Sequence, residues 1–154
     1  MKAIQAIVSV LFTVTTLYLI LAFLSPKTYR IDRSITIKAP IELIWSRISD
    51  FSQWKEWSSW YALDPRARYT YSEKQEKKMP SMHWVGSNSL SGTGSIVATS
   101  ISPMKSFQYN LKYTVPYKKK SIGGFLFMET TEGTKVTWYE EGNISFWRSP
   151  FMLF

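Results

Sequence analysis

The sequence contains one histidine, His83, the side chain whose ordinary pKa best suits acid–base catalysis near neutral pH. A general base must lie within hydrogen-bond distance of the proton that it takes, and a carboxylate usually orients it. The chain neighbours of His83 are Met82 and Trp84. If Trp84 faces the interior of a strand, alternation turns His83 toward solvent. We therefore expect no catalytic residue here.

The other reactive groups form no recognisable set either. The chain has no cysteine, so with one histidine a metal site would rest on carboxylates alone, and we expect neither a metal nor a cofactor. The glycine-rich stretch 91–94 does not open a helix, as a phosphate-binding loop would. The carboxylates expected near a pocket rim, which show no acid–base spacing, are Asp50, Asp64, Glu129 and Glu140.

An uncharged run from Ala3 to Leu24 lies between Lys2 and Lys27. As a helix it would be about 33 Å long, enough to cross the ~30 Å hydrocarbon core of a bilayer. It is longer than the apolar core of a signal peptide and has no clear cleavage site. We therefore predict a single-pass membrane protein with an anchor at residues 3–24, a linker at 25–28 and one domain at 29–154.

Charge gives a weaker indication of orientation and partners. More basic residues follow the apolar run than precede it, which favours a cytoplasmic domain. The formal charge of +8 suits a domain beside an anionic membrane. The basic residues are scattered, apart from Lys77-Lys78 and Lys118 to Lys120, which we interpret as turn tips, so we expect no nucleic-acid partner. The oligomeric state is left open.

The soluble part alternates in the manner of an antiparallel sheet. A strand is predicted at 29–38 with one apolar face, followed by a helix at 41–49 after Pro40 and a second short helix at 51–57 capped by Asp50. Short connections between the later segments imply an antiparallel meander. The further strands are predicted at residues 67–72, 81–87, 94–102, 106–115, 121–130 and 134–144.

This order and several motifs resemble the SRPBCC superfamily, the helix-grip group that includes START lipid-transfer domains and polyketide cyclases. The motifs are Arg33 to Pro40, Asp50 to Ser58, Gly92 to Gly94 and Gly133 to Trp138. The resemblance implies an α+β helix-grip fold: a curved antiparallel sheet of about seven strands with two short helices after the first strand. One feature departs from the family, whose long C-terminal helix closes the cavity, because only Phe151–Phe154 follows Pro150. We expect a natural continuation, or else an open face covered by a second copy or by the membrane.

The resemblance also places aromatic side chains around a cavity. They are Trp54, Trp57, Trp60, Tyr69, Tyr71, Trp84, Phe107, Tyr109, Phe125, Phe127 and Trp138. Any one of them could be core, but a sheet that curls around a cavity needs large amphipathic side chains whose polar tips meet ligand or water. The predicted ligand-binding residues are Trp84, Tyr109 and Trp138, with Tyr69 and Phe127, and with Trp57 and Trp60 at the rim or facing the membrane.

Three functions follow from the resemblance. The first is a membrane-tethered module that binds a hydrophobic or amphipathic small molecule, lipid-like or polycyclic. The second is a polyketide cyclase/dehydrase-like enzyme that uses the same cavity. The third is a protein-interaction or stress-response module. An acid–base pair inside the cavity would distinguish the enzyme from the binding module. Because the sequence supplies no such pair, we favour binding.

Overall fold

The computed structural model describes residues 1–73 and 78–152, with side chains to Ser149. The chain divides into two compact units. One unit comprises residues 30–142, and the other comprises residues 1–29 together with 143–154.

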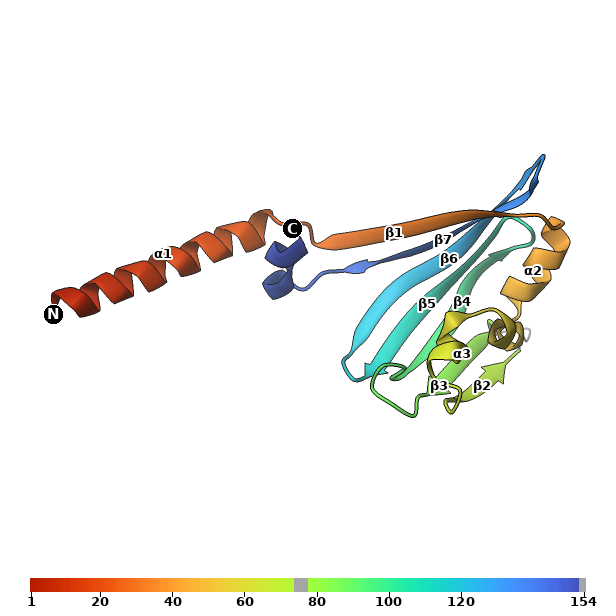
Figure 1. The fold of residues 1–154 in the computed structure, drawn as a ribbon, viewed down its shortest axis with the longest axis horizontal. Helices are drawn as coiled ribbons and strands as arrows, with labels where there is room; N and C mark the ends of the chain where they lie inside the picture. The colour runs from red at the N-terminus through yellow and green to blue at the C-terminus, as the bar shows by residue number, and fades with distance from the viewer. Residues whose placement is uncertain (74–77, 153–154) are drawn as a thin grey trace. The chain divides into compact units, whose positions relative to one another are not determined.

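The larger unit is built on a seven-stranded antiparallel sheet (Figure 1). The strands are β1 (Thr28–Ile37), β2 (Arg68–Ser72), β3 (Ser81–Val85), β4 (Thr93–Ser102), β5 (Ser106–Val115), β6 (Lys119–Thr130) and β7 (Gly133–Asn143). Their order across the sheet is β1-β7-β6-β5-β4-β3-β2, so β2 to β7 form a meander and β1 joins beside the last strand. This is the predicted helix-grip α+β fold.

Alternation along the strands separates a core face from an outer face. On β5 the side chains of Phe107, Tyr109 and Leu111 are buried, whereas Asn110 and Lys112, on either side of Leu111, are exposed. The ladder to β6 pairs Tyr109 with Gly123, and the next ladder pairs Phe125 with Trp138. The period of two therefore brings aromatic residues of three adjacent strands onto one face.

Three short helices pack over this face. They are α2 (Ile41–Ser49), the 3₁₀ helix η1 (Phe51–Glu56) and α3 (Ser59–Leu63). The helical spacing of Ile41, Ile44 and Ile48 buries one side of α2. Trp45 meets Phe127 of β6 edge to face, with ring centroids 5.4 Å apart.

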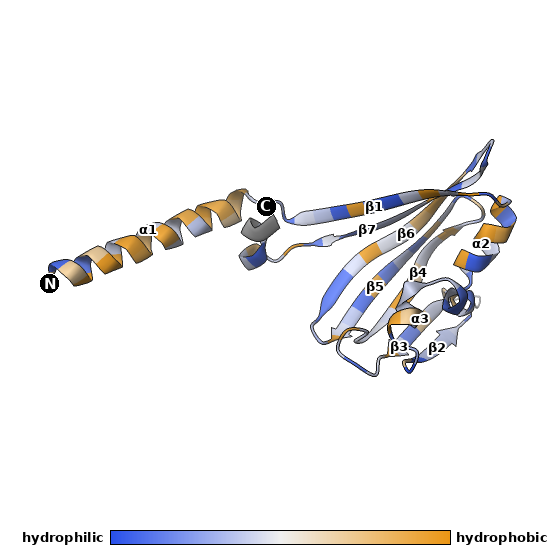
Figure 2. Cartoon of the chain, viewed as in Figure 1, coloured by the Kyte–Doolittle hydropathy of each residue, from blue (hydrophilic) through white to orange (hydrophobic). Residues whose placement is uncertain are grey.

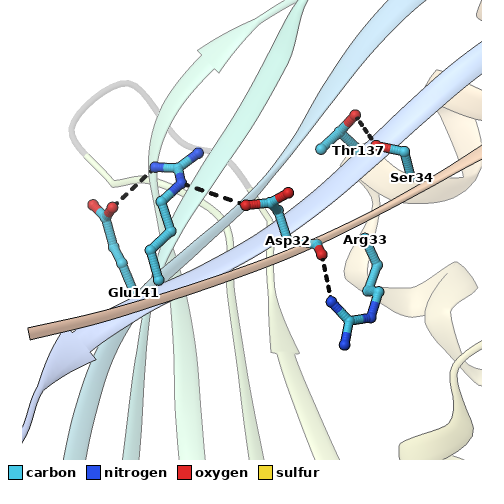
Figure 3. Close-up of polar contacts among 6 residues, drawn as sticks. Asp32, Arg33, Ser34, Thr137 and Glu141 are labelled. Atoms are coloured by element: carbon cyan, nitrogen blue, oxygen red, sulfur yellow. Dashed lines mark hydrogen bonds and ion pairs between the residues drawn. The ribbon is translucent and has the colours of Figure 1, made fainter. Parts of the chain in front are cut away.

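The expectation of one buried apolar face on the first strand is wrong. Ile31 is 46% exposed and Ile35 is 64% exposed, because the three helices cover other strands of the sheet. Polar contacts on the opposite side attach β1 to β7 (Figure 3). Arg30 Nη1 lies 3.0 Å from Glu141 Oε2, and the hydroxyls of Ser34 and Thr137 are 2.8 Å apart.

Two further predictions need correction. The second predicted helix, 51–57, is the shorter η1, and α3 follows it at a position where no helix was predicted. Lys118 to Lys120 were interpreted as a turn tip, but β6 begins at Lys119, whose Nζ lies 2.9 Å from Glu140 Oε1. Of the other basic pair, Lys77 lies outside the described residues.

The smaller unit contains the helix α1 (Lys2–Leu24) and the 3₁₀ helix η2 (Phe146–Met152), which was not predicted. Most large apolar side chains of α1 are exposed, and Figure 2 shows their hydrophobic character along the helix. By length and composition α1 is able to cross a membrane, although a signal sequence near an N-terminus has the same properties.

Candidate ligand-binding site

The inner face of β5, β6 and β7 forms one wall of the candidate site. Phe125 of β6 and Tyr109 of β5 are buried side by side, with ring centroids 6.3 Å apart. Trp138 of β7 is partly buried beside them. This wall is aromatic because alternate positions on the three strands carry rings rather than aliphatic side chains.

The opposite wall comes from η1 and the start of α3. The carboxylate of Asp50 caps η1 by accepting the backbone N–H of Ser52 at 2.8 Å, and Ser58 Oγ accepts the N–H of Trp60 at 3.3 Å. These caps fix the direction of the chain on either side of Trp54 and Trp57. Trp54 then points inward and is only 1% exposed.

Between these walls lies a pocket of about 400 Å³. Its lining residues are Trp54, Trp57, Ser58, Ser59, Trp60, Tyr109, Phe125 and Trp138. None of these described lining side chains carries a charge. The volume lies within the roughly 300–1,000 Å³ typical of small-molecule sites, and such sites are mainly apolar and aromatic.

The protein itself uses most of the indole N–H groups around this pocket. Trp54 Nε1 donates to the Ile48 carbonyl at 2.8 Å, and Trp57 Nε1 donates to the Arg47 carbonyl at 3.1 Å. These bonds fix two rings so that they offer their apolar surfaces. The arrangement suits flat or apolar ligand surfaces rather than highly polar ones.

The Tyr109 hydroxyl is a buried polar group in the pocket wall. It accepts a hydrogen bond from Trp138 Nε1 at 3.1 Å. Burial raises the pKa of Tyr109, so the phenol stays protonated at physiological pH and keeps a proton to donate. Its paired residue must be glycine: a Cβ at position 123 would lie 2.5 Å from the Tyr109 ring.

A second pocket of about 240 Å³ lies toward β2 and β3. Its lining residues are Trp60, Leu63, Tyr69, Met82, Trp84, Leu90, Ser91 and Tyr113. Trp60 contributes to both pockets and stacks on Trp84 with a centroid distance of 6.1 Å.

Comparison with known proteins assigns the fold to a family. A family model described as polyketide cyclase / dehydrase and lipid transport matches residues 28–153. The chain belongs to this family. No curated protein matches the sequence.

Solved structures are similar to this chain at the level of the fold. The protein MLL2253 from Mesorhizobium loti is 15% identical with a TM-score of 0.57, over 78% of this chain and 81% of that chain. A protein from Rhizobium leguminosarum is 14% identical with a TM-score of 0.58, over 82% and 86%. The di-domain aromatase/cyclase StfQ, from the steffimycin biosynthetic pathway, is 12% identical with a TM-score of 0.60, over 82% of this chain and 40% of that chain.

The structure distributes the predicted ligand-binding residues of this polyketide cyclase/dehydrase family member over two pockets. Trp57, Tyr109 and Trp138 line the larger pocket, Tyr69 and Trp84 line the smaller one, and Trp60 lines both. Phe127 lines neither and packs against Trp45 in the core. The prediction omitted two serines of the larger pocket, Ser58 and Ser59. Their position at the N-terminal cap of a helix was the sequence signal that could have identified them.

Trp54 and Phe125 also line the larger pocket but were absent from the predicted set. Both were among the aromatic residues of the sequence, and both belong to the buried core as well as to the pocket wall. His83 is exposed, as expected from the inward orientation of Trp84. Within residues 1–73 and 78–152, no three His, Cys, Asp or Glu side chains are grouped closely enough to hold a metal ion.

Asp64 is the most buried carboxylate near the pockets, with 2% exposure. It accepts hydrogen bonds from Ser87 N at 2.7 Å, Ser87 Oγ at 2.6 Å, Arg66 N at 3.2 Å and Ser91 Oγ. The serine hydroxyls lower its pKa most. The Ser91 carbonyl in turn accepts Trp84 Nε1 at 3.0 Å, so Asp64 organises the loop that holds Trp84.

We expect Asp64→Asn to lower the melting temperature by several degrees at pH 7. An amide can replace only part of the acceptor capacity of the carboxylate. Because the folded pKa lies below the unfolded value of about 3.9, the stabilisation is complete above that pH and is lost as the pH falls further. The difference in melting temperature between wild type and variant, measured by circular dichroism, should be constant from neutral pH down to about 5. It should shrink below about pH 4. Equal melting temperatures at pH 7 would contradict this role.

Proposed function

We propose that the protein is a membrane-anchored binding protein that holds a hydrophobic or amphipathic small molecule, lipid-like or polycyclic, in the larger pocket. The observation that carries the proposal is the uncharged aromatic lining: four tryptophans, one tyrosine and one phenylalanine around about 400 Å³. The two serine hydroxyls and the Tyr109 hydroxyl supply the few polar contacts that orient a ligand in such a site.

The membrane part of the proposal rests on α1. Ile4, Leu11 and Phe12 are each more than 60% exposed, so the helix needs an apolar environment outside the chain. A bilayer provides it. Lys27 and Arg30 follow the helix and favour placing the binding domain on the cytoplasmic side. Tethering raises the effective concentration of the site for ligands dissolved in the same membrane.

The alternative function is a cyclase- or dehydrase-like enzyme. The family description and the aromatase/cyclase StfQ favour it. Among residues 1–73 and 78–152, those that line the larger pocket include no carboxylate, imidazole or amine. Proton transfer would therefore depend on the Tyr109 hydroxyl, whose raised pKa makes it a weak acid. Binding without chemistry is the better match to this lining.

A titration tests the binding proposal. Pyrene added to the full-length protein in lipid nanodiscs should quench and shift the tryptophan emission, because four of the seven tryptophans line the larger pocket. Trp138→Ala should weaken binding by about 1–3 kcal/mol, the scale of losing a large apolar contact. Trp84→Ala should weaken it by a similar amount if the ligand extends into the smaller pocket, and otherwise by less.

Trp147→Phe is the matched control, because it removes an emitting residue that belongs to the smaller unit and lines neither pocket. Its affinity should equal that of wild type. Empty nanodiscs correct for partition of the probe into lipid. Unchanged affinity in Trp138→Ala, or an equal emission change with empty nanodiscs, would contradict binding in the larger pocket.

A further inference from the structure

The segment Phe146–Ser149, here called the interfacial segment, packs against the C-terminal end of α1 within the smaller unit. Trp147 stacks on Tyr18, with ring centroids 6.5 Å apart and planes 9° apart. Ser149 is fully buried, and its Oγ lies 3.2 Å from the Ala22 carbonyl, which is also fully buried. Small residues at this contact let the two backbones approach, as they do between helices in membranes.

Several polar groups at this contact have hydrogen-bond partners within the chain. The Trp147 carbonyl accepts the Tyr18 hydroxyl. The N–H groups of Arg148 and Ser149 donate to the Ser145 carbonyl at 2.9 and 3.0 Å. In hydrocarbon each unsatisfied backbone group costs several kcal/mol, so non-helical backbone needs internal partners of this kind.

The last carbonyls of α1 are capped in the same way. Ser25 N and Ser25 Oγ both donate to the Leu21 carbonyl, at 2.9 and 2.5 Å. Lys27 Nζ donates to the Ala22 carbonyl and lies 3.2 Å from Ser149 Oγ. A cation at a helix C-terminus is also favoured by the helix dipole.

The apolar side chains of the interfacial segment are only partly covered within the chain, although Lys27 Nζ lies 4.8 Å from the centroid of the Phe146 ring. Trp147 is 63% exposed and Phe146 is 37% exposed, although their backbone neighbours are well bonded. Tyr18 precedes the end of α1 by six residues, about 9 Å along the axis. With about 33 Å of uncharged helix in a ~30 Å core, a ring stacked on Tyr18 lies in the outer 5–10 Å of the acyl region.

We propose that the interfacial segment inserts into the boundary between headgroups and acyl chains, as a second membrane contact beside the transmembrane helix. The inference rests on the anchoring role proposed for α1. Trp and Tyr are the side chains enriched at this depth, because an amphipathic ring places its body in lipid and its polar edge near water. The bilayer thus covers the parts of the two rings that the chain itself leaves exposed.

Depth-dependent quenching tests the inference on full-length protein in phosphatidylcholine vesicles. One vesicle set carries bromine on the acyl chains near the headgroup, and another carries it near the chain ends. The contribution of Trp147 is obtained by subtracting the emission of Trp147→Phe. We expect the shallow bromine to quench this contribution about two-fold more than the deep bromine. A matched subtraction with Trp45→Phe, which reports a ring packed on Phe127, should show no bromine quenching.

The same vesicles are washed with alkaline carbonate, which separates the two possible failures. Protein that stays with the vesicles while Trp147 is unquenched would overturn the interfacial segment and leave the anchor intact. Protein that is released would overturn the anchor, and this inference with it. Stronger quenching by the deep bromine would also overturn it, because the ring would then lie among the chain ends.

Discussion

Trp54→Ala should destabilise the larger unit by about 3–5 kcal/mol, the range for removing a large aromatic side chain from a core. Trp54 is 1% exposed and contacts five rings edge-on or tilted, among them Phe51 at 5.0 Å and Tyr109 at 5.9 Å between centroids. It also donates to the Ile48 carbonyl. Because domains of this size are stable by only about 5–15 kcal/mol, the variant should be partly unfolded or close to it.

Two further variants make this expectation specific. Trp54→Phe keeps most of the ring but leaves the Ile48 carbonyl without its donor, and should cost about 1–3 kcal/mol. Trp57→Ala removes a neighbour that is 44% exposed, and should cost about 1 kcal/mol. Urea unfolding of the full chain in mild detergent, followed by tryptophan emission, gives the three values. A loss below about 1 kcal/mol for Trp54→Ala would show that the site is not organised around this residue.

The elements with a clean period were predictable from the sequence. The helix at Ile41–Ser49 and the strand at Ser106–Val115 have the predicted bounds, because Pro40 and strict alternation mark them. The five-residue helix α3 was not predicted, since it is too short to show a hydrophobic period. Its N-cap Ser58 was the only local signal. The start of β6 was missed because three consecutive lysines resemble a turn, whereas Lys119 forms an ion pair with Glu140 on the neighbouring strand.

The site was predictable as a set of aromatic residues but not as two pockets. Trp60 and Trp84 stack across the boundary between the pockets, and that contact joins α3 to β3. Phe127 has the same strand parity as Phe125, yet it lies beneath Trp45 of α2 and is core. Alternation along a strand predicts the face of the sheet on which a side chain lies. It does not predict which part of that face a helix covers, because this depends on tertiary packing. The exposure of Ile35 on β1 could not be predicted for the same reason.

The second large effect is expected in α1. Replacing both Leu11 and Val14 with arginine should abolish retention in membranes. Both positions lie near the middle of the uncharged run, and an arginine there opposes insertion by about 2.5–3.5 kcal/mol. Together the two substitutions outweigh the gain from the remaining apolar residues. Wild-type protein should stay in the membrane pellet after alkaline carbonate extraction, and the double variant should move to the supernatant.

A matched double variant, Leu11→Ile with Val14→Ile, keeps the positions apolar and should stay in the pellet. The intact mass of the wild-type protein decides between an anchor and a signal sequence, the other class that fits the helix by length and composition. An anchor predicts a mass that still includes α1, whereas a cleaved signal sequence predicts a mass that lacks it. Release of wild-type protein by carbonate, or a mature terminus near Pro26, would contradict the anchor. If carbonate released the isoleucine variant as well as the arginine variant, these positions would affect membrane retention for a reason other than charge.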